Sequence, residues 1–179
     1  MLLETDRLIL RKFQESDIDD FCELVIDSER NHMMGNDEIS SVDDAKSLFE
    51  WFMYKEERAY AVVLKATGKA VGNITVYNEP ADEIKSLPEL MGKTGRSISF
   101  SMARQYQRQG LMFEAVSAVV EHLFWAESVD YIHSGYLDFN VPSQKLHKKL
   151  GFTYLTTQRF HREEGGEEFV GIENILWRD

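Results

Sequence analysis

The stretch from residue 96 to residue 138 constrains the fold most strongly, because its hydrophobic period changes twice within a short length of chain. It opens with "RSISFSM", where Ile98, Phe100 and Met102 alternate with serines, and a period of two predicts a half-buried strand. Apolar residues then follow at helical spacing over residues 112–123, and "DYIHSGYLDFN" predicts another strand. A strand, a helix and a strand in this order predict a right-handed crossover between two parallel strands.

The flanking segments predict further strands and helices. "TDRLILRKF" is typical of a first strand, and two helices follow it, with Ser16 and Ser41 as their predicted N-caps. "YAVVLKATGKAVGNITVY" predicts a hairpin around Gly68, and residues 79–95 predict a long loop with one short helical turn. "PSQKLHKKLGF" predicts a short helix, and the end of the chain predicts a closing hairpin that turns at Gly165-Gly166.

This order of elements predicts a mixed α/β fold with one central sheet. The chain has 179 residues and no repeat or linker that would divide it, so we expect one domain over residues 1–179. Hydrophobic residues make up 43% of the chain and aromatic residues 12%, which is typical of a folded protein. Cys22 is the single cysteine, which excludes an internal disulfide, and its apolar helical surroundings favour a buried thiol over a reactive one.

The net charge of −11 argues against general nucleic-acid binding, which requires a basic face. The charge suits a cationic substrate such as an amine, although solubility alone accounts for it equally well. No apolar run reaches the ~18 residues that a membrane span requires, so we expect no membrane insertion. The opening "MLLETDRLILRKF" alternates as a strand does and does not resemble a signal peptide, which favours a cytoplasmic protein.

The turn "RQYQRQGLMFEA" joins the strand to the helix with one glycine, Gly110, at the junction. The first turn of a helix leaves backbone N–H groups without partners and carries partial positive charge, so it can hold a phosphate. Arg104 and Arg108 add guanidinium groups that suit a pyrophosphate. An ordinary glycine-containing loop with exposed polar groups remains the alternative for these residues alone.

Four stretches together resemble the GNAT superfamily of N-acetyltransferases, in its RimJ/RimL-like branch: "ETDRLILRKFQESDIDDF", "KATGKAVGNITV", "YQRQGLMFEA" and "NVPSQKLHKKLGF". That branch includes enzymes that acetylate the N-terminal amines of ribosomal proteins. The resemblance implies the acyl-CoA N-acyltransferase fold, a mostly antiparallel sheet with flanking helices and two splayed parallel strands. It also implies acetyl-CoA as the cofactor and no metal.

The resemblance assigns the cofactor contacts by position, with the pantetheine arm lying in the gap between the splayed strands. They fall on Ser101, Met102, Ala103, Gln107, Arg108, Gln109, Gly110, Leu111, Met112, Asn140 and Ser143. Two residues depart from the pattern, because Arg108 stands where glycine is common and Met112 where a second small residue is usual. Arg108 could clamp a phosphate or crowd the turn, and Met112 could narrow the site or simply pack in the core. For Asn140, a helix N-cap is the alternative role.

The leaving thiolate of CoA benefits from a nearby acid. Ser143 matches the family serine near the sulfur, although the same residue could cap or begin the short helix. His147 lies four residues later on the same helix face. It stands where relatives often carry a tyrosine that acts as the general acid, and a histidine could act in the same way. A surface histidine on a lysine-rich helix is the alternative. The Met102 amide is expected to face the developing oxyanion.

The general base is the least defined part of the predicted site. An alkyl amine has a pKa of about 10, so some group must accept its proton. Many relatives carry a glutamate on the strand "RSISFSM", but Ser97 stands at that position here. Asp138 on the neighbouring strand, Glu114 or a chain of waters could substitute, with Glu114 expected mainly to stabilise its helix. His133 is expected to be structural.

The sequence therefore predicts an N-acetyltransferase in which a primary amine attacks acetyl-CoA directly within a ternary complex. The acceptor is a peptide N-terminus or a small amine, and the protein is a monomer or a homodimer. An acyl-CoA-binding module without catalysis is the alternative, as is a protein that keeps the fold for structural purposes. Residues 79–95 are either a lid or subunit contact or a flexible insertion.

Overall fold

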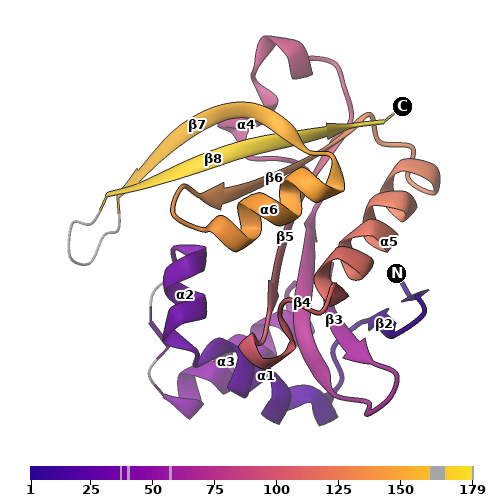
Figure 1. The fold of residues 1–179 in the computed structure, drawn as a ribbon, viewed down its shortest axis with the longest axis vertical. Helices are drawn as coiled ribbons and strands as arrows, with labels where there is room; N and C mark the ends of the chain where they lie inside the picture. The colour runs from indigo at the N-terminus through magenta and orange to yellow at the C-terminus, as the bar shows by residue number, and fades with distance from the viewer. Residues whose placement is uncertain (37, 40, 57, 162–167, 179) are drawn as a thin grey trace. The chain divides into compact units, whose positions relative to one another are not determined.

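The computed structural model describes residues 1–36, 38–39, 41–56, 58–161 and 168–178, and Figure 1 shows its ribbon. The elements follow the predicted order, except that three helices, and not the two predicted, lie between the first strands and the hairpin, because α2 (Ser28–Met34) was not predicted. The elements are β1 (Leu3–Glu4), β2 (Leu8–Arg11), η1 (Glu15–Asp17), α1 (Ile18–Val25), α2 (Ser28–Met34), α3 (Val42–Tyr54), β3 (Ala59–Leu64), β4 (Ala70–Tyr77), α4 (Asp82–Lys85), η2 (Pro88–Leu90), β5 (Gly95–Met102), η3 (Arg104–Tyr106), α5 (Leu111–Trp125), β6 (Tyr131–Leu137), α6 (Val141–Leu150), β7 (Thr153–His161) and β8 (Glu168–Trp177).

The strands form one mixed sheet with the order β1-β2-β3-β4-β5-β6-β8-β7. Antiparallel pairing joins β1 to β2, β2 to β3, β3 to β4, β6 to β8 and β8 to β7, whereas β5 and β6 are parallel. The predicted mixed α/β fold, mostly antiparallel with one strand–helix–strand crossover, is confirmed. The turn of the closing hairpin at Gly165-Gly166 lies outside the described residues.

The chain divides into two compact units, which are described separately below. The first contains Met1–His32, Asn36–Val76 and Phe100–Val119, and the second contains Met33–Gly35, Tyr77–Ser99 and Val120–Asp179. Strands β4 and β5 and helices α2 and α5 each contribute residues to both units. That the whole chain behaves as one domain stays a prediction.

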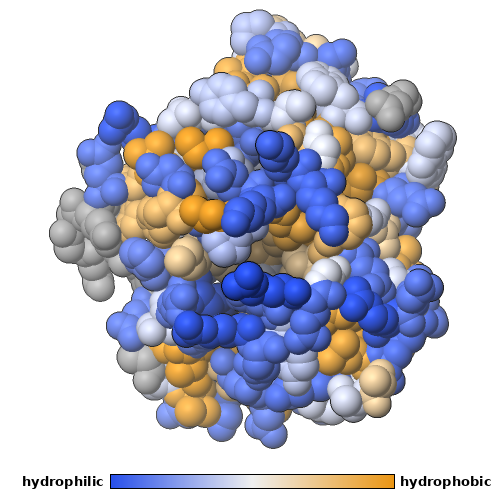
Figure 2. Space-filling view, in the orientation of Figure 1, coloured by the Kyte–Doolittle hydropathy of each residue, from blue (hydrophilic) through white to orange (hydrophobic). Residues whose placement is uncertain are grey.

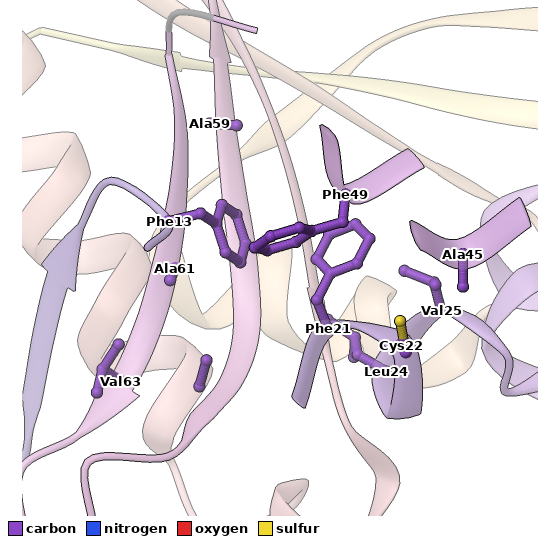
Figure 3. Close-up of a cluster of buried hydrophobic side chains, with 11 residues drawn as sticks. Phe13, Phe21, Cys22, Leu24, Val25, Ala45, Phe49, Ala59, Ala61 and Val63 are labelled. Carbon is purple, nitrogen blue, oxygen red and sulfur yellow. The ribbon is translucent and has the colours of Figure 1, made fainter. Parts of the chain in front are cut away.

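Aromatic rings form the core of the first unit (Figure 3). The Phe13 ring meets Phe21 edge-on at a centroid distance of 5.4 Å, and Phe21 contacts Phe49 of α3 at 5.3 Å. Edge-to-face and tilted pairs at these distances are favourable beyond the area that they bury. Cys22 lies in the same cluster, and burial raises the pKa of its thiol, so the predicted buried cysteine is confirmed.

The two predicted N-caps have different outcomes. Ser41 caps α3, because its Oγ accepts a hydrogen bond of 3.1 Å from the Asp44 backbone N–H. The prediction for Ser16 is wrong, since this residue lies inside the 3-10 turn that precedes α1. The buried carboxylate of Asp17 organises that turn instead, and it forms two hydrogen bonds to the Arg11 guanidinium, at 2.6 and 2.9 Å. A bidentate arginine partner explains how a carboxylate can be buried there.

The segment of residues 79–95 is anchored within the second unit. It contains the short helix α4 and the 3-10 turn η2, so the predicted loop with one helical turn holds more regular structure than expected. Ile84 and Leu90 project from it into a buried cluster with Tyr131 and Ile175. The flexible insertion considered from the sequence therefore does not describe this segment.

The parallel pairing of β5 with β6 is short. It joins Gly95–Ser97 to Tyr131–His133, whereas β5 itself continues to Met102. At the next residue, the Ile98 carbonyl accepts a hydrogen bond of 3.0 Å from the Ser134 hydroxyl. The Ile98 carbonyl thus accepts from a side chain, whereas in a continued parallel sheet it would accept from a backbone N–H. The ladder ends at this point, as expected for strands that splay.

The surface is rich in charged residues. Figure 2 shows hydrophilic side chains mixed with hydrophobic ones over the face that it displays. Among the described residues, no helix is both long enough and apolar enough to cross a membrane.

Candidate active site

The turn between β5 and α5, in the first unit, contains a row of backbone N–H groups that have no acceptor among the described residues. Two of its residues have a left-handed backbone, Arg108 with φ of 61° and Gly110 with φ of 77°. Within the described chain, the N–H groups of residues 108–112 donate to no acceptor, and the first helical bond runs from Glu114 N to Gly110 O. Successive free N–H groups at a helix start form an anion-binding concavity. These N–H groups lie at the turn where the sequence predicts a phosphate cradle.

Hydrogen bonds from both sides hold this turn in place. The Gln107 side-chain amide donates to the Met102 carbonyl at 3.0 Å and ties the turn to the end of β5. Arg7 donates from Nη1 to the Gln109 carbonyl at 3.0 Å and from Nε to the Glu114 carboxylate at 2.7 Å. The turn is therefore fixed before any ligand binds, which reduces the entropic cost of binding.

Glu114 is committed to this support. Burial is the largest single influence on its carboxylate and acts to raise the pKa, but hydrogen bonds from Thr5 and Arg7 and the Arg7 charge together outweigh burial, so the pKa is lowered. A carboxylate with a lowered pKa that already has three donors is a poor proton acceptor. Its predicted role in stabilising the start of the helix fits this position better than the role of base.

The two arginines of the turn differ in their surroundings. Arg104 forms an ion pair with Glu29, so its charge already has a partner. Arg108 is exposed, and its guanidinium has no partner in the portion of the chain that the structure describes. Leu111 and Met112 are buried at the start of α5, which favours the core-packing role for Met112. Of the two guanidinium groups, Arg108 is thus the one left for an anion.

The strand residues assigned to the cofactor are partly engaged elsewhere. Ser101 is buried, unlike Ser97 and Ser99 on the same strand, and its hydroxyl donates to Asn73 Oδ1 at 2.6 Å. It also accepts a hydrogen bond of 3.1 Å from Arg30 Nε. The Ala103 N–H donates to the Val71 carbonyl at 2.9 Å. Backbone contacts to a ligand would therefore fall on Ser101 and Met102 more readily than on Ala103.

Asn140 and Asp138 lie between β6 and α6 in the second unit. Asn140 is the N-cap of α6, because its Oδ1 accepts from the Ser143 N–H at 3.1 Å, and its amide donates to the Met33 carbonyl at 2.8 Å. The N-cap role considered from the sequence is thus present. Asp138 was expected on the strand, but β6 ends at Leu137 and Asp138 is an exposed turn residue.

Ser143 and His147 contact each other on α6. The His147 Nδ1 lies 2.8 Å from the Ser143 carbonyl oxygen and 3.3 Å from the Ser143 hydroxyl, and its Nε2 lies 3.0 Å from the Ser134 hydroxyl. The carbonyl oxygen can only accept, so the Nδ1 carries a proton. Ser143 belongs to the first turn of the helix and is not its cap.

His147 is buried, with 2% of its surface exposed, so the alternative of a surface histidine is wrong. Burial is the main cause that lowers its pKa to about 4. The imidazole is therefore neutral at pH 7 and holds no spare proton to donate. The sequence missed this environment because charged residues surround the position on both sides along the helix.

A second polar chain in the same unit was not anticipated. The His133 Nδ1 lies 2.9 Å from the Ser97 hydroxyl, and its Nε2 lies 2.8 Å from the Glu173 carboxylate. His133 and Glu173 are buried, and Ser97 is partly exposed. The three residues come from β5, β6 and β8, so only the register of the strands brings them together. Over the described residues, no group of three or more His, Cys, Asp or Glu is arranged to hold a metal ion.

The sequence is similar to known acetyltransferases. It is 26% identical over 156 residues to the uncharacterized N-acetyltransferase YoaA of Bacillus subtilis, and this alignment covers 84% of this chain and 82% of that protein. It is 29% identical over 123 residues to an N-alpha-acetyltransferase of Sulfurisphaera tokodaii, covering 65% of this chain and 70% of that one.

Solved structures share the fold. A GNAT-family acetyltransferase from Bacillus anthracis matches with a TM-score of 0.82 at 19% identity, covering 99% of this chain and 98% of that one. The ribosomal-protein-S5-alanine acetyltransferase of Vibrio fischeri matches with a TM-score of 0.71 at 18% identity, covering 100% and 97%. The sequence model of the acetyltransferase (GNAT) domain matches residues 7–153. The chain therefore belongs to the GNAT acetyltransferase family.

Proposed function

We propose that this protein is an acetyl-CoA-dependent N-acetyltransferase that transfers an acetyl group to a primary amine, with direct attack inside a ternary complex. The row of free N–H groups at residues 108–112 carries the proposal, because a diphosphate requires several converging donors. The family membership supports the same activity. When bound, acetyl-CoA would supply an acetyl group that is activated as a thioester.

The residues of the turn fit the diphosphate of CoA. The five amides have no acceptor within the described chain and belong to a turn that Gln107 and Arg7 already hold, and the guanidinium of Arg108, without a partner in the described residues, adds a positive charge. The overall charge of −11 repels an anion, so binding depends on these local donors. Arg108 is thus proposed as a phosphate clamp, and Gly110 lets the ligand approach the backbone.

Ser143 is proposed to donate a hydrogen bond to the departing thiolate. The His147 Nδ1–H faces the Ser143 hydroxyl oxygen at 3.3 Å and its carbonyl at 2.8 Å. Because the histidine supplies the proton in this contact, the Ser143 hydroxyl keeps its own proton for a ligand. His147 is proposed as the group that orients Ser143, since it is neutral at pH 7. The exposed Asp138 is kept as a proposed proton acceptor for the amine, although no contact of its side chain in the described part of the chain supports this role.

A peptide N-terminus is the favoured acceptor. One relative is named as an N-alpha-acetyltransferase, and one fold neighbour is a ribosomal-protein alanine acetyltransferase. An amine that is protonated in solution also suits the negative charge of the chain. We therefore propose peptide N-termini first and small primary amines second.

Thiol release from acetyl-CoA, measured with a panel of peptides and small amines, tests the activity. Each peptide is paired with a version that is already acetylated at its N-terminus and contains no lysine, which removes the acceptor and changes little else. Mass spectrometry then identifies the acetylated position. Calorimetric titration with CoA separately measures cofactor binding.

The expected result is CoA binding together with acetylation of the free N-terminus in at least one peptide. Binding of CoA with no turnover on any acceptor would instead indicate the module without catalysis. Absence of any CoA-induced rise in thermal stability would overturn the cofactor site, because a ligand of the native state must stabilise it.

A further inference from the structure

Ser97, His133 and Glu173 form a continuous hydrogen-bonded chain that leads from a partly exposed residue to a buried carboxylate. We propose that this chain is a proton relay that removes the proton of the acceptor amine, with Ser97 in contact with the amine and His133 as the final proton acceptor. The inference rests on the proposed function. It supplies the general base that the sequence alone did not identify.

The protonation state of the chain follows from the chemistry of its ends. An ionised carboxylate can only accept hydrogen bonds, so the His133 Nε2 carries a proton and donates it to Glu173 at 2.8 Å. In a neutral ring with this tautomer, the unprotonated Nδ1 accepts a hydrogen bond from the Ser97 hydroxyl at 2.9 Å. The Ser97 oxygen is left with lone pairs that can accept from a ligand. A base relay requires this arrangement at rest.

The backbone makes room for the buried carboxylate. A Cβ atom added at Gly135 would lie 2.3 Å from Glu173 Oε2, and one added at Gly171 would lie 2.9 Å from Glu173 Oε1. Gly135 pairs with Glu173 across β6 and β8, so the missing side chain leaves the space directly beside the carboxylate. The carboxylate is thus held at a fixed place beside the His133 ring. A buried charge that is held in this way stabilises the imidazolium that forms opposite it.

The proton moves in two coupled transfers. One N–H bond of the acceptor ammonium breaks as a new O–H bond forms at the Ser97 Oγ. The original Ser97 O–H bond breaks at the same time, and an N–H bond forms at the His133 Nδ1. The positive charge moves from the ammonium to the imidazolium beside Glu173, and the neutral amine is free to attack the thioester. After the acetyl group is transferred, the His133 Nδ1–H returns its proton to the Ser97 Oγ, and the Ser97 hydroxyl releases its own proton to solvent.

Two titratable groups face His133 from neighbouring elements in the described chain. Glu173 of β8 has its carboxylate Oε2 2.8 Å from the His133 Nε2. His147 of α6 also interacts with His133 electrostatically. Burial keeps His147 neutral at pH 7, so it does not oppose the charge that forms on His133. On β5, the side chain that reaches His133 is the Ser97 hydroxyl, which carries no charge.

The pH profile of kcat/KM for a peptide acceptor tests the relay in four variants of the full chain. Ser97→Ala breaks the relay at its partly exposed end, and Ser97→Thr keeps a hydroxyl there. His133→Gln removes the proton acceptor. Ser99→Ala is the matched control, because it removes a hydroxyl two residues away on the same strand. Circular dichroism and CoA titration establish that each variant folds and binds the cofactor.

At pH 7, we expect Ser97→Ala to lower kcat/KM by about 100-fold, the lower end of the usual contribution of general base catalysis. The deficit should narrow above pH 8, because the α-amino group of a peptide has a pKa of about 8 and free amine then forms without a base. Ser97→Thr should recover most of the rate, and Ser99→Ala should follow the wild type. A loss that is equal at every pH, or no loss, would overturn the relay while leaving the acetyltransferase activity intact.

A wild-type protein that turns over no amine at any pH would overturn both proposals, so the two failures are distinguishable. Should His133→Gln fail to fold, the nitrogen-15 shifts of His133 in the wild type give an independent measurement. We expect a protonated Nε2 and an unprotonated Nδ1 at pH 7. The opposite tautomer would overturn the relay, because an Nδ1 that already holds a proton cannot accept one from Ser97.

Discussion

At the scale of single residues, His147 links stability to pH. Burial lowers its pKa to about 4 from the ordinary value of 6.5. Between these two pH values the unfolded chain binds a proton at this histidine and the folded chain does not, so the free energy of unfolding falls as the pH falls. The full shift corresponds to about 3 kcal/mol, lost as the pH decreases from 6.5 to 4.

Urea unfolding of the wild type and of His147→Gln at a series of pH values checks this expectation. At pH 7, the difference in unfolding free energy between the two proteins measures how much the packing of the neutral His147 ring stabilises the fold. It should shrink by about 3 kcal/mol as the pH falls to 4, because the variant has no histidine to protonate. A difference that stays constant across the series would show that His147 titrates alike in the folded and unfolded chains.

Gly135 allows a second prediction at this scale. Because a Cβ there would lie 2.3 Å from Glu173 Oε2, Gly135→Ala should displace the carboxylate and cost about 1–3 kcal/mol of unfolding free energy. The same substitution should cost much less when Glu173→Ala is also present. Denaturant unfolding of the wild type, both single variants and the double variant measures the coupling. Additive costs would mean that the strain lies elsewhere.

At the scale of elements, the turn before α5 combines backbone strain with a ligand-facing charge. Arg108 adopts φ of 61°, which glycine accepts without penalty, so Arg108→Gly should raise stability by about 1 kcal/mol. The same change removes the guanidinium that we propose as a phosphate clamp, and the Kd for CoA should rise about tenfold. Thermal unfolding and calorimetry measure the two effects separately.

Arg104→Gln is the control for this prediction. Arg104 lies in the same turn region but pairs with Glu29, so its loss should change the CoA affinity less than the loss of Arg108. Equal weakening by both variants would indicate that only the local charge matters. No weakening by Arg108→Gly would mean that the backbone N–H groups bind the diphosphate without help.

The elements themselves were predictable from the sequence where periodicity and capping agree. The strand β5, the Ser41 cap and the hairpin around Gly68 depend on neighbours within a few residues. The relay was not predictable, because Ser97, His133 and Glu173 meet only through the register of three strands. His147 was misjudged for a related reason, since a helix with lysines beside the histidine gives no local sign of burial.

At the scale of the whole molecule, the charge of −11 should select among acceptors by their own charge. A long-range field attracts cationic ligands and repels anionic ones, and salt weakens both effects. The Debye length falls from about 30 Å at 0.01 M to about 8 Å at 0.15 M ionic strength. We therefore predict that kcat/KM for a lysine-containing peptide decreases several-fold over this range of salt.

The matched acceptor carries glutamates in place of the lysines and keeps the same N-terminal residue. Its kcat/KM should increase with salt, because screening relieves repulsion. The chemistry at the N-terminal amine is identical in the two peptides, so opposite salt dependences can arise only from the field of the protein. Parallel dependences would instead attribute the salt effect to acetyl-CoA, which is common to both assays, and the charge of the chain would then have no part in choosing the acceptor.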